Sequence, residues 1–209
     1  MNVTIIGTGN MARGIGTRLV AGGHGLTVVG KDNEAAEAVV RDLGAEDSAK
    51  VARSDDAVSD EVVVLAIYFP DATQFVEQHR DELAGKVLID ITNPVNESYD
   101  ALVTPPDGSA AQELAKLAPG ARVVKAFNTT FARTLSEGKV AGQPLDVLIA
   151  GDDDDAKATV ARLVEDGGLR AIDAGPLKRA RELEAAGLLH MSVQGPLGSG
   201  FASALKMLS

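Results

Sequence analysis

A glycine-rich segment near the N-terminus has the residue types and spacing that suit the binding of a dinucleotide. The apolar run at residues 3–6 enters residues 7–12 (GTGNMA), and a sequence of helical character follows. Gly7 permits a tight turn, Gly9 has no side chain to block a pyrophosphate, and the small Ala12 lets the helix pack against a sheet. We therefore expect the backbone amides of residues 8–11 to bind phosphate groups.

Strand-like and helix-like segments alternate after this loop, a pattern typical of a parallel sheet covered on both faces. Strands are expected at residues 26–29, 50–52, 62–67, 87–91, 122–127, 146–150 and 169–173, and helices at residues 11–21, 109–117, 153–165 and 177–209. We predict an α/β protein in which residues 1–175 form a Rossmann-type, doubly wound, mostly parallel sheet that binds a dinucleotide. Residues 176–209 would form a small helical C-terminal cap that completes the cleft.

Residues that directly follow the predicted strands should meet in one crevice, because ligands of open parallel sheets bind beyond the carboxyl ends of the strands. These residues provide amides, hydroxyls, asparagine side chains and aromatic rings, with no obvious acid–base pair. This set suits hydride transfer, in which the protein mainly positions two rings. We predict dinucleotide contacts from Gly7, Thr8, Gly9, Asn10, Met11, Gly30, Lys31, Ala66, Ile67 and Asn93, and a substrate pocket formed by Tyr68, Phe69, Pro94, Asn128, Thr129 and Thr130.

Two features of this crevice keep alternatives open. Tyr68 and Phe69 either stack on a ligand ring or close the hydrophobic core. The preference for NADP(H) rests on Gly30 and Lys31, because NAD-binding sites usually have an acidic residue where Gly30 stands, and a lysine beside a 2′-phosphate is favourable. If the second strand runs two residues further, Asp32 would instead bind the ribose of NAD; the other interpretation of Asp32 is a helix N-cap.

Composition limits the possible partners. The chain of 209 residues has 30 acidic and 20 basic residues, a formal charge of -10, and no cysteine. The negative charge argues against nucleic acid and anionic membranes as partners, and the absence of cysteine excludes disulfides and thiolate chemistry. No signal peptide or membrane-length apolar run is evident, so we expect a cytoplasmic protein. We assign no certain catalytic residue and no metal site, and we expect His190 to be a packed or capping residue.

Several motifs resemble those of the NADPH:deazaflavin (coenzyme F420) oxidoreductases. They are the glycine loop, the Gly23-His24 turn, residues 28–30, the segment 146–153 (DVLIAGDD) and the segment 173–177 (DAGPL). The resemblance covers nearly the whole chain. It implies hydride exchange between NADP(H) and a deazaflavin stacked on the nicotinamide, in a cleft completed by the C-terminal segment and often within a homodimer.

The chain departs from this family both where the 2′-phosphate of NADP(H) and where the second substrate would bind. The family usually has Ser-Arg where this chain has Lys31-Asp32, Ile-Pro where it has Ile67-Tyr68, and His-Thr where it has Asn128-Thr129. Residues 125–128 (KAFN) also resemble the oxidoreductase domain of the six-transmembrane metalloreductases. The alternatives are therefore an NADPH-dependent flavin or ferric reductase, and a non-catalytic module that binds NADP(H) as a sensor.

Overall fold

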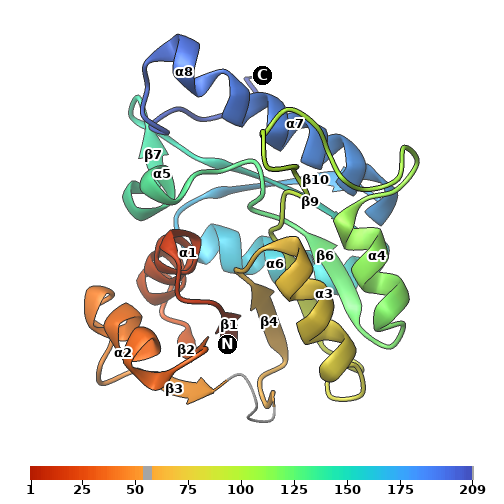
Figure 1. The fold of residues 1–209 in the computed structure, drawn as a ribbon. Coiled ribbons are helices and arrows are strands. Elements are labelled where there is room, and N and C mark those ends of the chain that lie inside the picture. The colour runs from red at the N-terminus through yellow and green to blue at the C-terminus, as the bar shows by residue number, and fades with distance from the viewer. Residues whose placement is uncertain (54–57, 209) are drawn as a thin grey trace.

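The computed structural model describes residues 1–53 and 58–208 and is built around an eight-stranded sheet (Figure 1). Its strands are β1 (Asn2–Ile6), β2 (Gly25–Gly30), β3 (Ala49–Arg53), β4 (Val62–Leu65), β5 (Val87–Asp90), β6 (Arg122–Lys125), β9 (Asp146–Gly151) and β10 (Arg170–Gly175), in the order β10-β9-β6-β5-β4-β1-β2-β3. Only the pairing of β6 with β9 is antiparallel among the described strand pairs of this sheet. The predicted doubly wound, mostly parallel sheet is confirmed.

Helices cover both faces of the sheet because its central strands are apolar on both sides. In β1, for example, Ile5 belongs to the core under one layer of helices and Ile6 to the core under the other, as expected for alternating side chains of a buried strand. One layer consists of α1 (Asn10–Ala21), α2 (Asn33–Asp42) and α6 (Asp154–Asp166), and the other of α3 (Phe69–Gln78) and α4 (Ala110–Leu117).

The strand order reverses at β1, which pairs with β2 on one side and with β4 on the other. The chain runs from β1 outward to β3 and then returns to β4, so the crossover connections leave β1 and β4 in opposite directions. Such a switch point opens a crevice beyond the carboxyl ends of the two strands. The fold therefore places the glycine loop after β1 beside the residues after β4.

The segment between β6 and β9 has more regular structure than the sequence indicated. It contains α5 (Ala132–Glu137) and a short hairpin of β7 (Lys139–Val140) and β8 (Gln143–Pro144). α5 packs on α1, which carries the glycine loop at its start. Gly14 makes this packing possible, because a Cβ there would lie 2.9 Å from the carbonyl oxygen of Ala132.

The C-terminal segment is helical for only part of its predicted length. After the 3₁₀ turn η1 (Leu177–Arg179) come α7 (Ala180–Ser192) and α8 (Gln194–Leu197), and residues 198–208 are not helical. The expected helix through residue 209 is thus wrong beyond Leu197, and Ser209 lies outside the described residues. Gly198 and Gly200 have φ angles of +61° and +55°, a left-handed conformation that ends helices and that glycine adopts without strain.

The tail after α8 returns to the sheet and is held by a buried carboxylate, Asp146. This side chain accepts hydrogen bonds from Arg170 at 2.8 and 2.6 Å and from the Met207 amide at 2.8 Å, and Lys206 also pairs with it. Burial raises the pKa of Asp146, but these hydrogen bonds outweigh it and lower the pKa to about 2. Among the described residues, no helix has the length and apolar character needed to cross a bilayer.

Candidate functional site

The loop between β1 and α1 has the backbone geometry of an anion cradle. Gly7 has a φ of +122°, and a Cβ on it would lie only 2.3 Å from the carbonyl oxygen of Ala66, so this tight turn against β4 requires glycine. Gly9, the N-cap of α1, faces open space: a Cβ on it would meet no described atom within 4 Å. No described side chain caps α1 and its first turn has no acidic residue, so its amides are free for an anionic group.

A cavity of about 600 Å³ extends from this cradle across the carboxyl ends of β1, β4, β5 and β6. Its size is typical of small-molecule and cofactor sites. Predicted site residues that line it are Gly9, Asn10, Met11, Ala66, Ile67, Tyr68, Phe69, Asn93, Pro94, Asn128 and Thr130. Four loops that are far apart in sequence therefore meet at one cavity, as the strand order requires.

Five predicted residues, Gly7, Thr8, Gly30, Lys31 and Thr129, lie outside the lining that the described residues form. Gly30 is next to the glycine loop, since a Cβ on it would lie 3.0 Å from Cγ2 of Thr8. Thr129 is buried, and its carbonyl oxygen contacts His190.

The end of β2 bears on the choice between the two dinucleotides. β2 ends at Gly30, Lys31 is exposed, and Asp32 is the N-cap of α2, where its carboxylate accepts a hydrogen bond of 2.8 Å from the Ala35 amide. Asp32 therefore has the helix-capping role that the sequence left open. Lys31 is a cation next to the end of β2, where the adenosine ribose lies in Rossmann folds.

Tyr68 and Phe69 have different environments. Tyr68 is 76% exposed at the cavity, whereas Phe69 packs against the core under α3 and α4. The chain has two tyrosines, and the second, Tyr99, also lines the cavity and is 55% exposed. Two roles were considered for this aromatic pair. Phe69 closes the core, whereas the exposed ring of Tyr68 is available to a ligand.

Sequence reasoning missed part of the lining. The missed residues are Pro70, Ile91, Val95, Asn96, Glu97, Tyr99, Val103, Phe131 and Met191. Thr92, which directly follows the strand expected at residues 87–91, lines the cavity as the rule of strand ends predicts, and Phe131 follows from the same rule applied more widely. The loop with Tyr99 is closed by a bridge between Val95 and Leu102, which no periodicity in the sequence indicates.

The floor of the cavity is polar. Asn93 Nδ2 donates to the Asn128 carbonyl oxygen at 2.8 Å, and Asn128 Nδ2 donates to Asn93 Oδ1 at 2.9 Å and to the Leu183 carbonyl oxygen at 2.8 Å. Two buried atoms of the lining residues, Thr92 Oγ1 and Asn128 Oδ1, find no hydrogen-bond partner among the described residues. Because buried polar atoms are normally paired, these two atoms fit a ligand that has polar groups at its edge.

α7 closes the cavity from the C-terminal side and contributes Met191. It approaches closely because of Gly187, where a Cβ would lie 2.5 Å from Asn93 Oδ1. His190 on the same helix is buried, with Nδ1 3.1 Å from the Thr129 carbonyl oxygen, Nε2 2.9 Å from Ser203 Oγ, and its ring 4.2 Å from that of Phe131. Burial lowers the pKa of His190. These contacts match the expected packing role, and the described residues contain no cluster suited to a metal ion.

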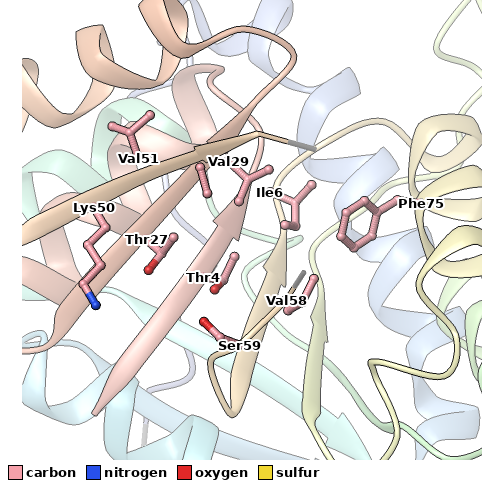
Figure 2. A pocket seen from close by; sticks show the side chains of 10 residues that line it. Thr4, Ile6, Thr27, Val29, Lys50, Val51, Val58, Ser59 and Phe75 are labelled. Carbon is pink, nitrogen blue, oxygen red and sulfur yellow. The ribbon is translucent and has the colours of Figure 1, made fainter. Parts of the chain in front are cut away.

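A second hollow, of about 160 Å³, lies over β1, β2 and β3 near Val58 and Ser59 (Figure 2). Its wall is a mixture of valines with the hydroxyls of Thr4 and Thr27 and the amine of Lys50. It contains none of the predicted site residues. Residues 54–57, which directly precede Val58 in the chain, are outside the described part. We assign this hollow no function.

Comparisons with known proteins agree with the geometry of the main cavity. Residues 2–94 match the family described as NADP oxidoreductase, coenzyme F420-dependent. The F420-dependent NADP reductase of Methanothermobacter thermautotrophicus is 34% identical over 200 residues, covering 88% of this chain and 85% of the relative. The rat metalloreductase STEAP3 is 34% identical over 183 residues, but the chain spans only 36% of its length.

Among solved structures, an Arthrobacter protein that is named provisionally as an F420-dependent NADP reductase superposes with a TM-score of 0.87 at 28% identity, over 99% of both chains. This similarity includes the C-terminal segment as well as the sheet. Sequence and structure therefore give the same assignment, and the chain belongs to the family of F420-dependent NADP reductases.

Proposed function

We propose that this protein transfers a hydride between NADP(H) and a deazaflavin of the F420 type, or a related flavin, in the 600 Å³ cavity. The observation that carries the proposal is the continuity of this cavity. It starts at the anion cradle of Gly9 and ends among Tyr68, Tyr99 and the paired side chains Asn93 and Asn128. One space thus has a place for a pyrophosphate and, beyond it, a place for planar rings.

The residues of the chain would act by binding and orienting. The nicotinamide, when bound, would supply or accept the hydride. The free amides at the start of α1 would hold the pyrophosphate, and the unpaired Thr92 Oγ1 and Asn128 Oδ1 would bond to polar ring edges. Aromatic and apolar walls would exclude water from the reacting carbons.

The acceptor is tested by anaerobic assays of NADPH oxidation with F420, FMN, FAD and ferric chelates. We expect the highest kcat/KM with F420. A ferric or free-flavin reductase is the second candidate, favoured by the similarity to the rat metalloreductase, and it predicts the highest value with those acceptors instead. Tight NADPH binding without turnover of any acceptor would contradict both enzymes and favour the sensor.

Lys31 is proposed to contact the 2′-phosphate of NADPH, because it is an exposed cation next to the end of β2 and Asp32 is engaged in capping α2. A charge-assisted contact contributes about 1.5–3 kcal/mol, so Lys31→Ala should weaken NADPH binding by about 10- to 100-fold and leave NADH unchanged. Titration calorimetry with both dinucleotides measures this, with Lys178→Ala as an exposed-lysine control on η1. Equal losses for NADPH and NADH would contradict the assignment.

The proposed setting is a cytoplasmic homodimer that does not bind nucleic acid. The charge of -10 opposes polyanionic partners. Support for a dimer comes from exposed apolar side chains in the C-terminal segment, namely Leu189, Leu197, Phe201, Leu205, Met207 and Leu208. In a dimer these side chains would be buried, and apolar patches are typical of protein interfaces. Sedimentation analysis tests this directly: a monomer at micromolar concentration would exclude the dimer.

A further inference from the structure

A buried ionic cluster of three side chains lies at the carboxyl ends of β5 and β6. Lys125 Nζ is 2.9 Å from Asp90 Oδ2 and 2.8 Å from Glu184 Oε1, and all three side chains have no exposed surface. Lys125 also donates to the Thr92 carbonyl oxygen. None of the three residues lines the cavity that the described residues form, so the cluster belongs to the support of the site and not to its wall.

Each member of the cluster is joined to a different element next to the cavity. Asp90 ends β5, and its Oδ1 accepts a 2.8 Å hydrogen bond from the Thr92 amide. Lys125 ends β6, only three residues before Asn128. Glu184 is on α7, and its Oε2 accepts a 3.1 Å hydrogen bond from the Ala110 amide at the start of α4. The cluster therefore ties both loops of the polar floor to the helix that closes the cavity.

Stability alone does not account for three charges at this depth. Replacement of a buried ionic cluster by well-packed apolar side chains is often neutral or stabilising, because the desolvation of the charges offsets their attraction. Burial raises the pKa of Glu184, which reflects this desolvation, although Lys125 opposes it. The charges instead fix the orientation of the backbone around them: their hydrogen bonds hold the carbonyl and amide of Thr92 and the start of α4.

The loop after β6 needs such support because its backbone is strained. Phe127, between Lys125 and Asn128, is buried and has a φ of +62°, a left-handed conformation that is unfavourable for a residue with a large side chain. This conformation turns the chain so that Asn128 faces Asn93. A strained turn persists only where its surroundings hold it in place. Lys125, fixed by the ionic cluster, holds the N-terminal side of the turn at Phe127.

We propose that Lys125, Asp90 and Glu184 are positioning residues for the second substrate: they hold the loops with Asn93 and Asn128 in the geometry that aligns the acceptor with the nicotinamide. The proposal rests on the function proposed above. It assigns the cluster to the acceptor half of the cavity, since none of its hydrogen bonds among the described residues reaches the anion cradle of Gly9 on β1 and α1. Asn93, which the sequence predicted as a dinucleotide contact, is assigned here to the acceptor because its side chain pairs with Asn128.

The test uses Lys125→Met, which removes the charge and leaves an unbranched side chain one atom shorter, and Glu184→Gln, a milder change that can still accept from Lys125. For both variants we expect the affinity for NADPH to stay within about twofold of the wild type. We expect kcat/KM for the acceptor to fall about tenfold, because even partial misplacement of reacting groups slows the reaction. The control for lost stability is Leu163→Ala, a core substitution on α6. We expect this variant to have a lower melting temperature than the wild type and an unchanged cavity.

A second measurement separates this inference from the proposed function. Hydrogen exchange of the amides in residues 92–96 and 128–131 should be faster in Lys125→Met and Glu184→Gln than in the wild type, and unchanged in residues 8–12. If wild-type protein turned over no acceptor, the proposed function would fail while the exchange data still tested the cluster. Unchanged exchange in both loops, or an equal loss of NADPH binding and acceptor turnover, would overturn the positioning role. If Lys125→Met does not fold, Glu184→Gln alone decides the matter.

Discussion

Gly9→Val should abolish detectable NADPH binding and leave the fold intact. Gly9 has φ and ψ angles of -80° and -174°, an extended conformation that valine adopts readily, and a Cβ there meets no described atom within 4 Å. The new side chain would fill the space in front of the α1 amides, where the pyrophosphate is proposed to bind. Loss of two charge-assisted hydrogen bonds, at about 1.5–3 kcal/mol each, would weaken binding by about 10²- to 10⁴-fold.

Two other glycines make the experiment specific. Gly195→Val is the matched control, because a Cβ added to Gly195 on α8 would also meet open space, and this residue is far along the chain from the cradle. Gly7→Ala should behave in the opposite way and lower stability, because its Cβ would clash with the Ala66 carbonyl oxygen at 2.3 Å. Calorimetry gives the affinity and circular dichroism the fold. An unchanged NADPH affinity of folded Gly9→Val would disprove the assignment of the loop.

The features that could be predicted from sequence are those that depend on local chemistry. The turn at Gly7, the open face at Gly9 and the buried strands around them follow from backbone sterics and from runs of apolar residues, and the structure has them where they were expected. Because ligands of parallel sheets bind beyond the strand ends, distant residues such as Ile67, Asn93 and Asn128 were also predicted to meet, and all three line one cavity.

The features that could not be predicted depend on long-range packing. Nothing near Tyr99 in the sequence indicates that the bridge between Val95 and Leu102 folds it over the cavity. Lys125 lies inside the strand expected at residues 122–127, and its burial becomes evident only when Asp90 and Glu184, 35 and 59 residues away along the chain, are brought to it. The tail after Leu197 was expected to be helical, whereas two left-handed glycines, Gly198 and Gly200, redirect it.

Met191→Trp should stop hydride transfer while NADPH still binds. Met191 is half-buried and lines the cavity from α7, which belongs to the C-terminal segment, whereas the anion cradle is at the start of α1. A larger, rigid indole there would occupy space proposed for the acceptor ring. Because a hydride moves only when donor and acceptor carbons approach to about 3–3.5 Å, and a displacement of about 1 Å can cost about 100-fold, we expect kcat to fall by at least about 100-fold.

The control is Ala185→Trp, which adds the same side chain at an exposed position of the same helix. Stopped-flow measurement of NADPH oxidation under anaerobic conditions gives the hydride-transfer rate, and calorimetry gives the affinity for NADPH. A rate reduced in Met191→Trp but not in Ala185→Trp, with NADPH affinity retained, would also support residues 176–209 as the segment that completes the cleft. If Met191→Trp instead retained the wild-type rate, the acceptor would have to bind away from α7, and the C-terminal segment would have no part in the site.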